Sequence, residues 1–117
     1  MKNLILETLS LLAILLASAA SHAAGPEECA GSASQMSECL RIELTMADQD
    51  LRILLQRNLA NPQIGVRLVN SHKAWLEFRD ADCTLQSADF IGSIEDVAKS
   101  QCMLDMTRDR IARLKTM

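Results

Sequence analysis

The sequence contains few of the residues that end helices and few aromatic residues. Its 117 residues include two prolines, four glycines, two phenylalanines, one tryptophan and no tyrosine. Almost no segment alternates apolar and polar residues with a period of two, which is the pattern of a half-buried strand. The shortage of turn residues and the missing alternation argue against a β-sheet and favour an all-α fold.

Side-chain combinations typical of enzymes and metal centres are also missing. Beyond residue 23, His72 is the only histidine, and its place on an apolar helical stripe indicates a hydrogen-bonded core or boundary residue. Paired acids such as Asp80 and Asp82 lie two residues apart, a spacing that separates side chains on a helix. There is no glycine-rich phosphate loop, C-x-x-C pair or zinc-type ligand spacing. We therefore expect a protein without enzymatic activity, cofactor or metal.

The charge pattern lacks a run of lysine or arginine, and the formal net charge is −3. A mildly acidic chain without a basic run does not have the charge distribution that binds nucleic acid or anionic lipid. The expected partner is therefore another protein.

The first residues have the pattern of a secretory signal peptide. A lysine precedes an apolar run rich in leucine and alanine, and small residues stand before Ala24. We expect cleavage after Ala23, which separates a signal peptide of residues 1–23 from one mature domain of residues 24–117, located in the periplasm or secreted. A retained membrane anchor is the alternative, whereas a lipid anchor is disfavoured because no cysteine directly follows the apolar run.

Turn residues divide the mature chain into three helical segments. Pro62 and Gly65 separate the first from the second, and Gly92 with Ser93 separates the second from the third. The first segment repeats apolar residues at steps of three and four, which predicts one buried stripe. These positions are Met36, Leu40, Leu44, Ala47, Leu51, Leu55 and Leu59. Since both connections are short, we expect an antiparallel three-helix up-down bundle.

Serines mark the starts of two predicted helices. Ser32 or Ser34 can cap the first helix, and Ser93 can cap the third, because a serine hydroxyl accepts a hydrogen bond from a free backbone N–H. The second helix is expected over about residues 66–90 and the third over about residues 93–115.

Four cysteines lie beyond the expected signal peptide, and in a small secreted chain they indicate two disulfides. Cys83 and Cys102 lie at similar distances before and after Gly92, so antiparallel helices bring them level. This geometry favours Cys83–Cys102, which leaves Cys29 to pair with Cys39, over the two other pairings that four cysteines allow. We interpret both bridges as structural.

Arg79 lies on the predicted inner face of the second helix, one turn after Trp75. A buried guanidinium is costly without a carboxylate partner. We expect Arg79 to pair with Asp48 or Asp50 of the first helix, with Trp75 packed beside it and Arg110 competing for the same aspartates. This group is interpreted as a structural network that fixes the helix register.

The chain is acidic around the turn between the second and third helices. Residues 77–96 include six acidic residues against one basic residue, Arg79. Asp89, Glu95 and Asp96 lie nearest the turn, and our hypothesis is that they bind an electropositive partner. The alternative is an ordinary solvated helix end, where the helix dipole favours acids.

Several motifs of the mature chain resemble one bacterial family. They are Cys29-x9-Cys39, Ala47-Asp48-Gln49-Asp50-Leu51, the block Trp75-x-x-Phe78-Arg79-Asp80-x-x-Cys83, and Cys102 followed by Thr107-x-x-Arg110 and Leu114. Together they resemble the small secreted or lipid-anchored proteins named for the lysozyme inhibitor LprI, over nearly all of the mature chain. The chain departs from the family pattern at Arg52, which no tyrosine follows, and it has no lipobox cysteine.

This resemblance implies a helical, disulfide-stabilised protein of the bacterial envelope and, for some members, the binding and inhibition of lysozyme. Lysozymes are commonly basic, so a mildly acidic partner is steered toward them. We expect a non-enzymatic binding protein that inhibits a basic lysozyme by surface occlusion. The alternative is a structural, adaptor or immunity-type envelope protein without lysozyme activity.

Overall fold

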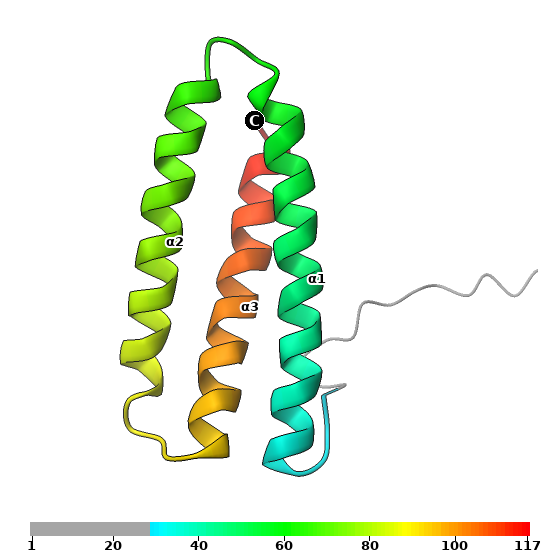
Figure 1. The fold of residues 1–117 in the computed structure, drawn as a ribbon, viewed down its shortest axis with the longest axis vertical. Helices are drawn as coiled ribbons and strands as arrows, with labels where there is room; N and C mark the ends of the chain where they lie inside the picture. The colour runs from blue at the N-terminus through cyan, green and yellow to red at the C-terminus, as the bar shows by residue number, and fades with distance from the viewer. Residues whose placement is uncertain (1–28) are drawn as a thin grey trace, which may run out of the picture.

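The computed structural model describes residues 29–117, which form three α-helices joined by short connections (Figure 1). They are α1 (Ala33–Leu59), α2 (Gly65–Ser87) and α3 (Ser93–Lys115), and this part of the chain contains no strand. The predicted all-α class and the three helical segments are confirmed, although α2 ends earlier than expected. The predicted signal peptide, residues 1–23, lies outside the described residues.

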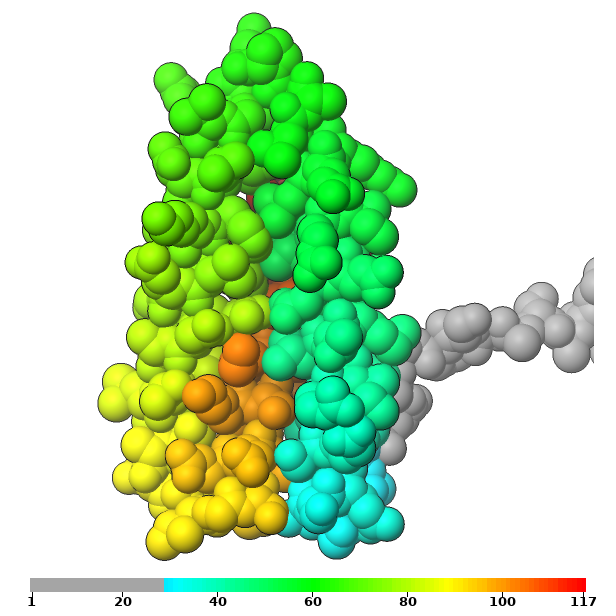
Figure 2. All heavy atoms as spheres, in the orientation of Figure 1, coloured from blue at the N-terminus to red at the C-terminus, as the bar shows by residue number. Residues whose placement is uncertain are grey.

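Consecutive helices run in opposite directions, and α3 lies behind the other two in the view of Figure 1. Contacts are densest between α1 and α3 and sparsest between α1 and α2. Figure 2 accordingly shows atoms of α3 along the seam between α1 and α2. One end of the bundle carries the α1–α2 connection and the end of α3, and the opposite end carries the start of α1 and the α2–α3 connection.

The two expected serine caps have different outcomes. Ser32 caps α1 through a reciprocal pair of hydrogen bonds with Gln35, in which each side chain accepts from the other residue's backbone N–H. The prediction that Ser93 caps α3 is wrong, because Gly92 is the N-cap and no side chain caps this helix. Gly92 has φ 65°, a conformation that glycine adopts at little cost, and this places Ser93 already inside the helix.

The apolar core is built mainly from α1 and α3. Leu40 and Ala47 pack with Leu104 near the start of α1, and a second cluster lies toward the other end of the bundle. That second cluster contains Leu51, Leu55, Leu68 and Leu114. In α2, Leu68 is the only buried aliphatic residue, and the other buried residues are Arg79, Cys83 and Ser87. The attachment of α2 therefore depends on polar and covalent contacts as much as on apolar burial.

Both expected disulfides are present and use all four cysteines. Cys29 pairs with Cys39, and Cys83 with Cys102. The first bridge ties the segment before α1 to the second turn of that helix, and the second joins the end of α2 to α3. The predicted pairing is thus confirmed.

Candidate functional site

A buried arginine joins the three helices. Arg79 of α2 is 5% exposed, and one of its terminal nitrogens donates to Oδ1 of Asp48 on α1 at 2.7 Å and to Oγ1 of Thr107 on α3 at 2.9 Å. Its Nε donates to Oδ1 of Asp80 at 3.1 Å. Thr107 is fully buried and donates its own proton to the carbonyl of Met103. The guanidinium thus has charged and neutral acceptors from all three helices, which offset the cost of burying it.

Trp75 lies beside this arginine within a group of cationic side chains. The guanidinium carbon of Arg79 is 5.2 Å from the ring centre, that of Arg110 is 5.7 Å away, and the ring of His72 stacks at 5.8 Å. Arg110 donates to the hydroxyl of Ser71 at 2.9 Å and, among residues 29–117, forms no ion pair with an aspartate. Trp75 therefore acts as a packing partner for two cations, in the geometry of cation–π contacts.

The two candidate aspartates are placed differently. Asp48 reaches Arg79, whereas Asp50 is exposed and lines a shallow groove with Arg57 and Lys115. Thr107, which the resemblance motif included without a role, supplies the third acceptor. Its position three residues after Leu104 on the inner face of α3 is the signal that could have identified it.

Several motifs that carry the family resemblance therefore meet in one place. Asp48, Trp75, Arg79, Thr107 and Arg110 meet between the helices, where Arg79 and Thr107 are buried and the other three are half-buried. Within residues 29–117, no group of three or more histidine, cysteine or acidic side chains is placed to hold a metal ion. The network connects α2 to α1 through Asp48 and to α3 through Thr107 and Arg110.

His72 connects this network to stability at acidic pH. It is half-buried, and its Nδ1 has no hydrogen-bond partner in the described part of the chain, contrary to the expectation of a hydrogen-bonded histidine. Burial, together with the positive charges of Arg110 and Arg79, lowers the pKa of His72 below its ordinary value, against a smaller opposing effect of Asp48.

The lowered pKa predicts a pH dependence. As the pH falls below about 6.5, the unfolded chain binds a proton at this histidine more readily than the folded protein does, so stability falls. We expect the free energy of unfolding to fall as the pH drops from about 6.5 through the lowered pKa of His72, and His72→Gln to reduce that fall. Urea denaturation at several pH values measures the free energy of unfolding of both proteins. The same dependence on pH in the unaltered protein and in His72→Gln would contradict this prediction.

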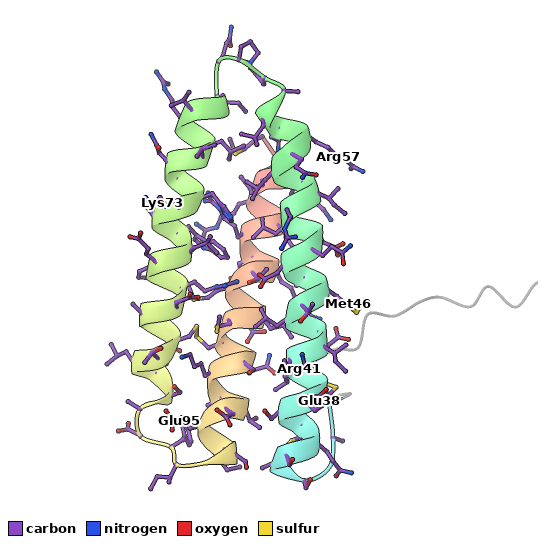
Figure 3. All side chains as sticks on the ribbon, in the orientation of Figure 1. Glu38, Arg41, Met46, Arg57, Lys73 and Glu95 are labelled. Atoms are coloured by element: carbon purple, nitrogen blue, oxygen red, sulfur yellow. A yellow bond between two sulfur atoms is a disulfide. The ribbon has the colours of Figure 1, made fainter. Side chains whose placement is uncertain are left out.

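The α2–α3 connection forms a second candidate site, which we call the hairpin end and define as residues 85–96. Asp89, Glu95 and Asp96 are all exposed there, and Figure 3 shows Glu95 at this end of the bundle. Exposed apolar side chains lie among these acids, and Ile91 is 89% exposed. They are Leu85, Phe90, Ile91 and Ile94. Sequence reasoning found the acids but missed the apolar side chains between them.

The hairpin end itself carries no positive charge, and the nearest basic residue after it, Lys99, is half-buried on α3. Residues 85–96 include no lysine or arginine, and the basic residue nearest before them, Arg79, is buried and paired with Asp48. The Cys83–Cys102 bridge lies directly behind this end, and Ser87 is buried and donates its hydroxyl proton to the carbonyl of Thr84. The surface is therefore acidic, partly apolar and held by a covalent link.

Comparison with known proteins gives one match. A family model described as lysozyme inhibitor LprI matches residues 26–114. Comparison with curated proteins and with solved structures gives no match. In residues 29–117, none of the helices combines the length and apolar character needed to cross a membrane.

Proposed function

Because this chain belongs to the LprI lysozyme-inhibitor family, we propose that it acts outside the cytoplasm as a binding protein that inhibits a basic lysozyme by covering part of its surface. The observation that carries this proposal is the hairpin end. It presents three exposed acids and four exposed apolar side chains on a stretch of twelve residues without a basic side chain, residues 85–96.

The two kinds of side chain at the hairpin end supply different parts of binding. Acidic groups attract a cationic partner over several ångströms and raise the rate of encounter. Apolar groups such as Phe90 and Ile91 lose contact with water when the partner covers them, and aromatic side chains frequently dominate interface energetics. Exposed apolar groups within an acidic surface are therefore suited to a basic protein that has its own apolar patch.

The bridge behind the hairpin end supports the same proposal. A surface that is already ordered loses little conformational entropy on binding, which leaves more of the contact energy as affinity. The Cys83–Cys102 bridge and the buried Ser87 limit the motion of α2 relative to α3 at this end. Disulfides also favour an oxidising compartment, and periplasmic or secreted localisation belongs to this proposal.

Charge reversal at the hairpin end tests the proposal. We expect Asp89→Lys, Glu95→Lys and Asp96→Lys together to lower the affinity for a basic lysozyme about tenfold or more at low salt, mainly by slowing association. The difference between the variant and the unaltered protein should shrink at high salt, because salt screens the attraction. Association and dissociation rates measured by surface plasmon resonance at several salt concentrations give both quantities.

A matched control separates the hairpin end from overall charge. Reversal of Asp50, Glu77 and Asp105 changes the net charge equally at exposed acidic positions outside residues 85–96. We expect a clearly smaller loss from this control. Equal losses of affinity in the two variants would show that only overall charge matters. No loss of affinity in either variant would show that these acidic residues do not contribute to binding.

A further inference from the structure

The end of the bundle opposite to the hairpin end is rich in basic side chains, and acidic side chains lie only at its border. Residues 51–76 and 110–117 contain no aspartate and no glutamate. We call these two stretches the cationic end. Their basic residues are Arg52, Arg57, Arg67, Lys73, Arg110, Arg113 and Lys115.

The topology brings these residues together from three separate parts of the sequence. The end of α1, the start of α2 and the end of α3 meet at this end of the bundle (Figure 1). Arg57 and Lys115 line one groove between α1 and α3, and Arg67 and Arg110 line another between α2 and α3. Figure 3 shows Arg57 and Lys73 toward this end, with Glu95 at the other.

The charges of the cationic end are available to a partner. All of its basic residues except the half-buried Arg110 are exposed. Within residues 29–117, none of the seven takes part in an ion pair. Three acidic residues, Asp50, Glu77 and Asp109, directly border these two stretches, and Asp50 lines the groove that contains Arg57 and Lys115. The positive charge of the basic side chains is therefore not neutralised by ion pairs within the described part of the protein.

The two ends act as separate electrostatic surfaces. A helix of the length of α2, 23 residues, spans about 35 Å. Screening at physiological ionic strength reduces interactions between exposed charges beyond about 8 Å. The net charge of −3 therefore describes neither end, and a partner meets either a positive or a negative surface.

Exposed apolar side chains accompany the cations at the α1–α2 connection. Val66 is 75% exposed, and Leu59 and Val69 are also exposed. Leu59 and Val69 line an apolar groove of about 210 Å³ between α1 and α2, beside Lys73. Cationic side chains next to exposed apolar ones suit the head-group region of a membrane, which offers phosphates and hydrocarbon at adjacent depths. A nucleic acid or an acidic polymer offers the phosphates or carboxylates without the hydrocarbon.

We propose that the cationic end binds the surface of an anionic phospholipid membrane, with Leu59, Val66 and Val69 at the head-group boundary. In this orientation the hairpin end points away from the lipid, where it meets soluble partners. The proposal differs from the sequence expectation of no membrane contact, because that expectation rested on contiguous basic runs and the cationic end is assembled from separate segments. It does not depend on inhibition of lysozyme.

Vesicle co-sedimentation of the oxidised protein tests the proposal. We expect binding to vesicles of phosphatidylglycerol and phosphatidylcholine at low salt, at least about tenfold weaker binding to phosphatidylcholine alone, and release at high salt. Arg57→Gln with Lys73→Gln should weaken binding about 25-fold, since each lost cation corresponds to about a fivefold change, or ~1 kcal/mol. Arg41→Gln with Lys99→Gln removes the same charge outside the cationic end, at a residue paired with Glu38 and at a half-buried one, and should leave binding within about twofold.

The apolar contribution separates lipid from other polyanions. Val66→Ser should weaken vesicle binding and leave the weaker binding to duplex DNA unchanged. Failure to bind anionic vesicles at low salt would overturn the proposal, as would equal losses in the two double variants. Tighter binding to duplex DNA than to anionic vesicles would also overturn it, by making the cationic end a general polyanion site. Circular dichroism of each variant verifies that the helices remain folded.

Discussion

We expect Asp48→Ala to lower the free energy of unfolding by about 3 kcal/mol, because it removes the principal anionic partner of a buried guanidinium. The side chain of Arg79 is 6% exposed, and its contact with Asp48 at 2.7 Å is its shortest ion pair. Asp80 and the hydroxyl of Thr107 remain as acceptors, and Asp48 itself is partly exposed, so the loss lies near the lower limit for breaking a buried pair. Chemical denaturation measures the change.

Two variants show that this loss belongs to the ion pair. Asp50→Ala, at an exposed position two residues further along α1, should change stability by about 0.5 kcal/mol or less. Arg79→Met in the Asp48→Ala background removes the uncompensated charge, so the double variant should be more stable than Asp48→Ala alone. If Asp48→Ala cost no more than Asp50→Ala, Arg79 would not depend on this partner.

Removal of the Cys83–Cys102 bridge has the second large effect. Cys83→Ala with Cys102→Ala should cost about 3 kcal/mol, from the chain entropy of a loop with a sequence separation of 19. Cys83 is fully buried, and the other buried residues in the second half of α2 are Arg79 and Ser87, so no buried aliphatic side chain supports the end of this helix. Thermal unfolding under non-reducing conditions measures the loss.

Hydrogen exchange locates the effect of this bridge. The backbone amides of the second half of α2 and of residues 85–96 should exchange faster without the Cys83–Cys102 bridge. Cys29→Ala with Cys39→Ala removes a loop with a separation of 10 that does not include α2, and should raise exchange at the hairpin end less than loss of the Cys83–Cys102 bridge does. Unchanged exchange after loss of the Cys83–Cys102 bridge would show that other contacts hold this end.

The helices and the disulfides were predictable because they depend on local spacing. Leucines at steps of three and four define the buried stripe of α1, and turn residues such as Pro62 and Gly92 mark the connections. Once the helices are antiparallel, similar distances from the turn bring Cys83 level with Cys102. No long-range information is needed for any of these steps.

The choice between Asp48 and Asp50 required the structure. Two residues on a helix differ in direction by about 200°, so only one of the two side chains can face α2. The positions of the buried residues show which face of α1 packs against the other two helices together. They do not show which side of that face contacts α2 and which side contacts α3. The role of Thr107 as the third acceptor also required the structure, because it depends on where the guanidinium of Arg79 lies.

The cationic end could not be predicted from the sequence for a related reason. Its basic residues come from three segments separated in sequence, and none of those segments is itself a basic run. The acids of the hairpin end lie within a single stretch, residues 85–96, and were therefore found directly. A run of like charges in the sequence indicates a charged surface formed by one segment. It gives no sign of a charged surface that forms only when separate segments pack together in the bundle.

The proposed inhibition of a basic lysozyme can be tested directly by following the turbidity of a bacterial cell-wall suspension during lysis. With the oxidised protein added in increasing amounts, we predict that the rate of clearing falls until it approaches that of a suspension without enzyme. Clearing at the full rate in the presence of a large excess of the protein, with each of several basic lysozymes, would contradict the claim.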